Sequence, residues 1–344
     1  MIEPKPLFIE RLRKLIPDEK DFARFNEIIH IKPVNSIRCN TIKISPSELR
    51  KRLEEKGWKI HQPFSEHKEV MIVTSELEPG ELGRAREHLT GLYYIQEISS
   101  MLPLLALKPK QGELVLDLFA APGSKTTQMA ALMENKGTII ANDNDISRIS
   151  ILASNIERCG AMNVLVARHD AVILCGKLLK LGIRFDKILL DVPCSGEGTT
   201  RGSPKTFIIW NPRMIKKLSR MQRKFIASAV PLLKEGGELV YSTCTYAPEE
   251  NEKNVNFIIK EMGLTIQDAG LPVKCREGVT EWDGEIFSDE VKKACRILPQ
   301  DNNTEGFFVS KFRKEGNFEH LKVQKEGNQD FDVSKFKKTQ GEGE

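Results

Sequence analysis

The stretch LVLDLFAAPGSKTTQ, residues 114–128, decides the fold of this chain. Its apolar first part has the length and composition of a buried strand, and the small residues that follow predict a loop that turns directly into a helix. From Gly112 to about Cys244, short apolar runs of this kind alternate with amphipathic stretches. That alternation is typical of βαβ units. It predicts an α/β fold with a mainly parallel, doubly wound sheet, which binds ligands at the carboxyl ends of its strands.

The same pattern places the other elements. Strands are predicted at Leu114–Phe119, Thr138–Asn142, Val164–Arg168, Lys187–Leu190 and Glu238–Ser242. Helices are predicted at Ser124–Glu134, Ile146–Cys159, Pro212–Leu233 and Pro248–Met262, and a last strand at Gly306–Phe312. Residues 109–313 are therefore expected to form the larger domain.

The first 108 residues have signals of their own, which predict a small α/β domain with a linker. The expected elements are a helix at Pro6–Leu15, a strand at Ser36–Lys43, a helix at Pro46–Lys56 capped by Ser45 or Ser47 and ended by Gly57, and extended pieces at Trp58–His61 and Val70–Val73. Residues 314–344 are rich in lysine, glutamate and glycine, so a polar, mobile tail is expected there.

Composition favours a soluble protein. Hydrophobic residues make up 40% of the chain and charged residues 29%, as in ordinary globular proteins. No run approaches the roughly 18 apolar residues of a membrane span, and the acidic, proline-bearing start is not a secretory signal. We therefore expect a cytoplasmic protein with no membrane partner.

The cysteines do not suggest crosslinks or metal binding. There are seven, an odd number, and none has the short paired spacing of a disulfide framework or a CxxC zinc site. Most are expected to be small buried hydrophobic residues, and no metal is expected.

Charge is concentrated in one segment. The net charge of +4 is small, but residues 201–224 carry eight basic side chains and no acid. Such a block can neutralise the phosphates of a polyanion. It can also be the solvated face of an amphipathic helix, because apolar residues recur at helical spacing within it. The basic residues are Arg201, Lys205, Arg213, Lys216, Lys217, Arg220, Arg223 and Lys224.

The loop at Ala120–Lys125 is a candidate cofactor site. Small residues after a strand let main-chain amides approach a ligand, and the following helix presents its positive end. The loop is neither GxGxxG nor a P-loop, so a nucleotide-like ligand without phosphates fits it best.

Carboxylates end the next strands in turn, at Asp143, Asp170 and Asp191. An acid after the second strand of such a sheet commonly holds ribose hydroxyls. Asp143 can instead begin a turn, and Asp170 can cap the next helix.

Two cysteines lie at the same predicted sheet edge. Cys194 follows Pro193 in DVPCSGEG, and Cys244 lies in STCTYAPEENE. A thiolate is a strong nucleophile once its pKa is lowered, although either cysteine alone can simply be buried at the end of a strand. Two of them beside a cofactor loop suggest covalent chemistry on an electrophilic ring.

These motifs together resemble the Nop/Sun family of RNA cytosine-C5 methyltransferases, in its compact archaeal, tRNA-directed form. The likeness lies in Asp117–Gln128, Asp191–Gly198 and Ser242–Glu252, with support from Gly91–Ser100, Arg38–Lys43 and Gly306–Lys311. It implies a Rossmann-like S-adenosylmethionine-dependent methyltransferase with an RRM-like N-terminal domain. The implied partner is RNA, with tRNA favoured because no long basic extension is visible.

The resemblance also implies roles. Cys244 would add to carbon 6 of the cytosine, Asp191 would support the ring nitrogen, and Cys194 would help eliminate the adduct. Lys125 would reach the base or the loop. The implied cofactor-binding residues are Ala120, Ala121, Pro122, Gly123, Ser124, Lys125, Asp143, Arg148, Asp170 and Asp191.

Three alternatives remain from the sequence. The target can be rRNA, the enzyme can be a related transferase that acts on protein or a small molecule, or the chain can be a catalytically silent RNA-binding factor. The presence of Asp191, Cys194 and Cys244 together favours the enzyme. A monomer is expected.

Overall fold

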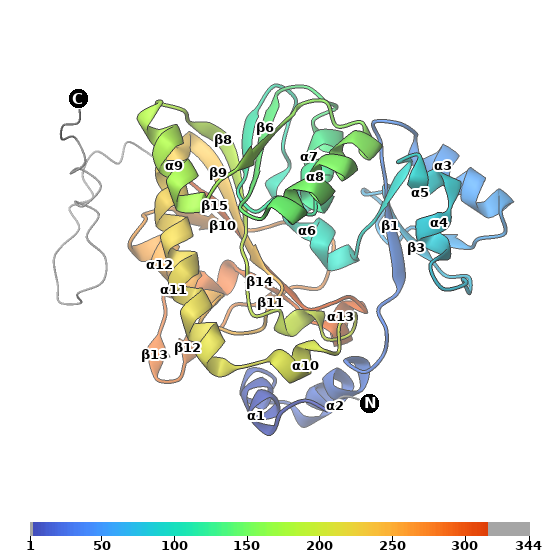
Figure 1. Ribbon diagram of the computed structural model, residues 1–344. Helices are drawn as coiled ribbons and strands as arrows, with labels where there is room; N and C mark the ends of the chain where they lie inside the picture. The colour runs from blue at the N-terminus through green and yellow to red at the C-terminus, as the bar shows by residue number, and fades with distance from the viewer. Residues whose placement is uncertain (1–2, 316–344) are drawn as a thin grey trace.

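The computed structural model describes residues 3–315, and a large sheet runs through its centre (Figure 1). Within those residues the sheet has nine strands in the order β11-β14-β15-β9-β8-β5-β6-β7, with β10 paired to β15. Strands β9 to β7 are parallel, and β15 joins β9 antiparallel. The bounds are β5 Leu114–Asp117, β6 Thr138–Asp143, β7 Val164–Arg168, β8 Phe185–Asp191, β9 Leu233–Thr243, β10 Thr265–Gln267, β11 Arg276–Glu277, β14 Cys295–Ile297 and β15 Phe307–Arg313.

Helices pack on both faces of this sheet and bury two apolar cores. On one face lie α6 (Ile98–Leu107), α7 (Ser124–Leu132) and α8 (Ile146–Cys159). On the other lie α9 (Ala171–Lys180), α11 (Pro212–Ala229) and α12 (Glu252–Lys260). The predicted doubly wound α/β fold is confirmed, and the predicted bounds of β7 and α8 are those observed.

A second, antiparallel sheet lies beside the first, in the order β2-β3-β1-β4. Its elements are β1 Asn35–Cys39, α3 Pro46–Glu55, β2 Ile60–His61, β3 Val70–Val73, α4 Glu81–Arg84, α5 Arg86–Leu89 and β4 Tyr93–Ile95. Of the two candidate caps, the Ser45 hydroxyl accepts the Glu48 amide at 3.2 Å. Gly57 ends the helix region with φ +90°, a conformation that side chains disfavour.

The first two helices pack against the larger part of the chain rather than the small sheet. They are α1 (Pro6–Leu15) and α2 (Glu19–Ile28), of which only α1 was predicted. Phe8 meets Phe207 and Trp210 edge to face, with centroids 5.5 and 5.4 Å apart. The ring centroids of Phe25 and Tyr246 are 5.5 Å apart, so this aromatic cluster packs against the loop that follows β9 and carries Cys244, called here the Thr-Cys loop. The remaining elements are η1 Glu197–Thr199, α10 Thr206–Ile209, η2 Val230–Leu232, β12 Glu281–Trp282, β13 Glu285–Ile286, η3 Asp289–Lys293 and α13 Pro299–Asn302.

The sequence argument against disulfides is wrong for one pair. Cys275 and Cys295, 20 residues apart, are bonded to each other. Antiparallel pairing of β11 with β14 brings them together, and that register is invisible in cysteine spacing. Cys39, Cys159 and Cys175 are buried and free, as expected.

Two further predictions concern the C-terminal tail and membrane-spanning segments. Of the predicted tail, residues 316–344 lie outside them, while Lys314 still donates its amide to the Gly237 carbonyl at 3.0 Å. Between residues 3 and 315, no helix has the length and apolar character needed to cross a bilayer.

Candidate active site

Two neighbouring parallel strands bring the cysteines together. β8 and β9 are in register with Asp191 opposite Ser242, so the chain leaves both strands at the same edge. The Sγ atoms of Cys194 and Cys244 are 3.2 Å apart, and the Cys244 amide donates to the Cys194 sulfur at 3.3 Å. The predicted meeting of the two thiols is therefore observed.

The two thiols are in unequal surroundings. The pKa of Cys194 is raised well above its usual value, first by the hydrogen bond with Cys244, then by burial and by the charge of Glu250. Cys194 consequently keeps its proton.

Asp191 and Lys125 form an ion pair beside the thiols. Their Oδ2 and Nζ atoms are 2.8 Å apart, and both side chains are largely buried. The Ser242 hydroxyl donates to the other Asp191 oxygen at 2.8 Å. Lys125 also donates to Ser100 at 3.0 Å and lies 5.5 Å from the centre of the Phe307 ring. A carboxylate and an ammonium fixed in this way can bind complementary polar edges of one ring.

Asp117 is a candidate that the sequence reasoning did not single out. It ends β5 directly before the small-residue loop, and its side chain is 1% exposed. The Thr126 hydroxyl donates to Oδ2 at 2.7 Å, whereas Oδ1 has no hydrogen-bond partner among residues 3–315. Burial raises the pKa of Asp117 to about 7, against the lowering effect of Thr126. Its position at a strand end was the available signal.

The loop Ala120–Lys125 packs closely against the end of β6 and against α8. Its start is held by the Ala120 amide, which donates to the Asn142 carbonyl at 2.7 Å. Gly123 has φ +104°, and a Cβ there would come within 3.0 Å of Leu152 Cδ1. Ser124 begins α7, so the loop leads directly into the N-terminus of a helix, as predicted.

Arg148 joins this loop to the end of β6. Its guanidinium is 3.3 Å from Asp143 Oδ2 and donates to the Ala121 carbonyl at 2.6 Å. Asp143 also accepts the Asp145 amide, and Asp170 caps α9 by accepting two amides. The turn and cap that the sequence left as alternatives are thus both present, and a ligand role for Asp143 and Asp170 stays a prediction.

A buried arginine connects the small sheet to the loop. Arg38 on β1 is 2% exposed and donates to the Ser124 carbonyl at 2.6 Å and to Thr127 Oγ1 at 2.9 Å. It contacts Gln96 as well. The first turn of α7 is therefore held from the N-terminal side, which the motif Arg38–Lys43 alone did not reveal.

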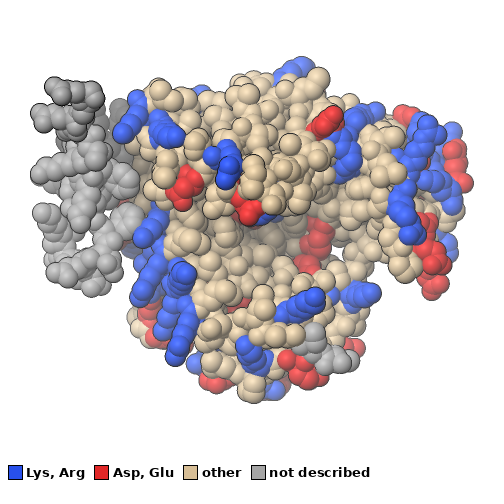
Figure 2. Space-filling model, viewed as in Figure 1, with Lys and Arg blue, Asp and Glu red and all other residues tan. Residues whose placement is uncertain are grey.

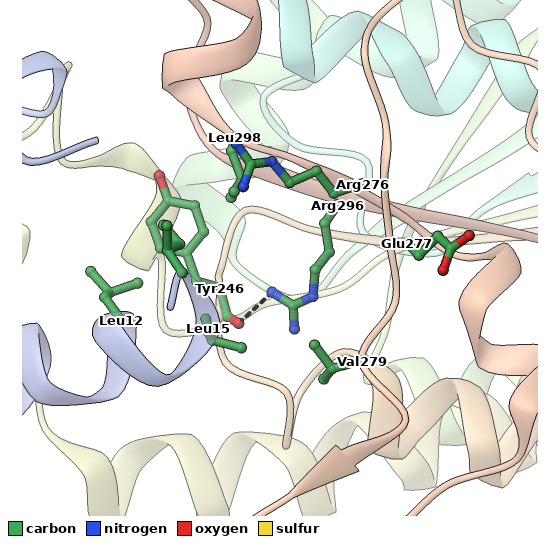
Figure 3. Close-up of a pocket in the computed structure, with 9 residues that line it drawn as sticks. Leu12, Leu15, Tyr246, Arg276, Glu277, Val279, Arg296 and Leu298 are labelled. Atoms are coloured by element: carbon green, nitrogen blue, oxygen red, sulfur yellow. Dashed lines mark hydrogen bonds between the residues drawn. The ribbon is translucent and has the colours of Figure 1, made fainter. Parts of the chain in front are cut away.

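Buried charged side chains hold the Thr-Cys loop in place. Glu252 pairs with Arg296, which also donates to the Tyr246 carbonyl at 3.0 Å, the dashed contact in Figure 3. Arg296 and Tyr246 line a cavity of about 70 Å³, and Leu12 and Leu15 of α1 line it from the other side. Glu197 accepts from Thr245 Oγ1 at 3.0 Å. Cys244 therefore lies next to a turn that is held by hydrogen bonds to Arg296 and Glu197.

The basic residues of segment 201–224 divide into buried and exposed ones. Figure 2 shows lysines and arginines along the side of the molecule where α11 runs. The prediction that Arg201 belongs to this surface is wrong. Its side chain is buried and donates to the Ile31 and Thr304 carbonyls. Arg223 is half-buried over Phe257. The exposed basic residues are Lys205 before α10 and Arg213, Lys216, Lys217, Arg220 and Lys224 on α11.

Comparison with known proteins gives these features a context. Residues 104–313 match the model of the family described as 16S rRNA methyltransferase RsmB/F, and residues 5–98 match the N-terminal domain of 16S rRNA methyltransferase RsmF. The chain belongs to this family. It is therefore placed among the S-adenosylmethionine-dependent RNA cytosine-C5 methyltransferases, the class that its motifs implied.

Relatives in the family differ in their named RNA. The chain is 41% identical to a tRNA (cytosine(49)-C(5))-methyltransferase of Pyrococcus abyssi over 89% of its own length and 95% of that protein. It is 38% identical to ribosomal RNA small subunit methyltransferase F of Aliivibrio salmonicida over 89% of its length, but spans only 63% of that protein.

Solved structures agree with the fold. A methyltransferase homologue from Pyrococcus horikoshii superposes with a TM-score of 0.75 at 36% identity, covering 90% of this chain and 99% of that one. NSun6 from the same organism, described as a structure with SFG, gives 0.75 at 27% identity over 91% and 99%.

Proposed function

We propose that this protein transfers a methyl group from S-adenosylmethionine to carbon 5 of cytosine in tRNA, through a covalent bond between Cys244 and the base. The observation that carries the proposal is the pair of sulfur atoms 3.2 Å apart, next to the Lys125–Asp191 ion pair. A transferase acting on a nucleophilic nitrogen or oxygen needs no such pair of thiols.

The residues around the small loop fit S-adenosylmethionine. The unpartnered Asp117 Oδ1 offers a buried acceptor to a cationic ligand. Ala120–Lys125 would contact the ligand through main-chain atoms, with Asp143 and Arg148 at the ribose and Asp170 at the adenine. When bound, this cofactor supplies the electrophilic methyl group.

Cys244 is the attacking thiol. Its sulfur bonds to carbon 6 of the cytosine after losing a proton to solvent, and the electron pair of the ring double bond makes carbon 5 nucleophilic. The Asp191 carboxyl group would hydrogen-bond the ring nitrogen where charge develops. Lys125, held by Asp191 and Ser100, would face the polar edge of the base.

Cys194 acts when the product leaves. The C5–H bond breaks, its electrons re-form the ring double bond, and the carbon–sulfur bond to Cys244 breaks. Cys194 retains a proton and lies 3.2 Å from the departing sulfur, so it can give that proton to Cys244 and take the one from carbon 5. This exchange leaves the number of protons unchanged.

The basic surface of α11 would hold the RNA backbone. The target base must leave its stack to reach thiols at the sheet edge, and phosphate contacts can hold the strand while it does so. Figure 2 shows that the face beside α11 is hollowed at its centre.

tRNA is favoured over rRNA by the near end-to-end match to the Pyrococcus abyssi enzyme. Bisulfite sequencing of RNA from a strain lacking the gene tests this choice. Loss of a methylcytosine from tRNA is expected, whereas loss from 16S rRNA alone would transfer the proposal to rRNA.

The two cysteines can be assigned by trapping the adduct. Cys194→Ala should accumulate a protein–RNA complex that survives denaturing electrophoresis, because the adduct forms but is released slowly. Cys244→Ala should form none. An adduct in the Cys244 variant would reverse the assignment, and RNA binding without methyl transfer by the wild type would mean that the protein is a catalytically silent factor.

A further inference from the structure

Cys194 lies in a loop whose main chain is held on both sides by buried side chains. On the preceding side, the Pro193 carbonyl accepts a hydrogen bond from Gln222 Nε2 at 2.9 Å. On the following side, the Ser195 amide donates to Glu250 Oε2 at 3.1 Å. Gln222 and Glu250 are both completely buried. β8 has already ended at Asp191, so strand pairing does not fix this part of the loop.

The two side chains are also bonded to each other. Gln222 Nε2 donates to Glu250 Oε2 at 2.7 Å, so the amide nitrogen uses one hydrogen for Glu250 and the other for Pro193. Its oxygen accepts from Asn254 Nδ2 at 2.9 Å. Every donor and acceptor of the Gln222 amide therefore has a partner, which fixes its orientation.

This pair connects three separate parts of the chain. Gln222 is on α11, Glu250 is in the loop after Cys244, and both contact the loop that carries Cys194. A second contact joins the same loops, between the Ser195 and Thr245 hydroxyls at 2.7 Å. The position of one sulfur relative to the other is consequently set by side chains that contact neither sulfur.

Such positioning matters for the release of the product. Proton exchange between the two sulfurs requires a short distance, and a displacement of about 1 Å in a reacting group can cost roughly 100-fold in rate. Attack by Cys244 does not need Cys194 at the same distance. Loosening the Cys194 loop should therefore slow release more than attack.

We propose that Gln222 and Glu250 are positioning residues that hold Cys194 beside Cys244 for release of the methylated base. The inference rests on the proposed function, because it assumes that Cys194 acts in release. Neither residue is expected to contact the RNA or the cofactor.

Two near-isosteric substitutions test it in the full-length protein. Gln222→Met removes both donated hydrogen bonds, and Glu250→Met removes the carboxylate oxygen that accepts from the Ser195 amide and from Gln222. Glu249→Met is the matched control, because Glu249 is the adjacent carboxylate but pairs with Arg11 at 2.7 Å. Turnover, KM for RNA and the fraction of denaturation-resistant adduct are measured with tRNA transcript and labelled cofactor, and thermal unfolding confirms the fold.

Both variants should lose about tenfold in kcat, with KM for RNA unchanged and a severalfold larger adduct fraction. The control should match the wild type. Unchanged kcat and adduct, or a parallel loss of adduct and activity in both folded variants, would overturn the inference. Cys194→Ala in the same gel distinguishes failure of the positioning inference from failure of the proposed function. If Cys194→Ala accumulates adduct and the two variants do not, only the positioning inference fails. If Cys194→Ala accumulates no adduct, the proposed role of Cys194 in release fails.

Discussion

Asp117→Asn should make the stability of the cofactor-free protein less dependent on pH. The wild-type carboxyl group is buried, and burial raises its pKa from 3.8 to about 7. A carboxyl group whose pKa is higher in the folded than in the unfolded state favours folding while it is protonated in both. That stability is complete below pH 3.8 and is lost progressively as pH rises toward 7.

The size of the effect follows from the two pKa values. Each whole pKa unit corresponds to about 1.4 kcal/mol, so the full difference between folded and unfolded protein is about 4 kcal/mol, of which about 3 kcal/mol develops between pH 5 and pH 8. An asparagine does not titrate, so the variant lacks this component. Other buried acids with raised pKa values, such as Glu250 and Glu305, remain in both proteins and cancel in the comparison.

Urea unfolding at pH 5 and pH 8 measures the difference. The free energy of unfolding of the wild type should fall by about 3 kcal/mol more than that of Asp117→Asn over this range. Asp268→Asn is the matched control: Asp268 is exposed, its turn contact with Gly270 can be kept by an amide oxygen, and it should follow the wild type. If Asp117→Asn and wild type show the same pH dependence, Asp117 is ionised at little cost and the argument from burial is refuted.

Two further predictions concern surfaces away from the thiols. Lys217→Glu combined with Arg220→Glu on α11 should weaken RNA binding and lower the magnitude of its log–log salt dependence by about 2, as measured by filter binding, because about one phosphate contact is lost at each position. Lys136→Glu, in the turn between α7 and β6, should leave that dependence unchanged; equal effects would mean that α11 is only a solvated face. Replacing Cys275 and Cys295 by serine should lower the free energy of unfolding by about 3 kcal/mol under oxidising conditions, and no change in denaturant midpoint relative to the oxidised wild type would contradict a stabilising disulfide.

Local signals were enough to predict the main elements. The alternation of apolar strands with amphipathic helices gave the parallel sheet, because each βαβ unit carries its periodicity in a short window. The bounds of α1, β7 and α8 were predicted correctly. α2 was missed, and β1 was predicted to extend to Lys43, whereas the chain turns after Cys39.

The candidate site was only partly visible from the sequence. Cys194, Cys244 and Asp191 were found because each lies at or shortly after a strand end, and the carboxyl ends of parallel strands meet at one edge. Lys125 lies in the first turn of α7, and only the family resemblance pointed to it. Arg201 was misjudged because a basic residue in a basic segment carries no local sign that its side chain points inward.

The sequence by itself therefore determined the kind of chemistry: two thiols, a carboxylate and a cofactor loop at one sheet edge. The tertiary structure decided how these groups differ and what holds them. The hydrogen bond with Cys244 and burial raise the pKa of Cys194, and Gln222 and Glu250 contact its loop from other elements. The disulfide between Cys275 and Cys295 depends on strand register in the same way. Such contacts join residues far apart in the chain, so no local pattern records them.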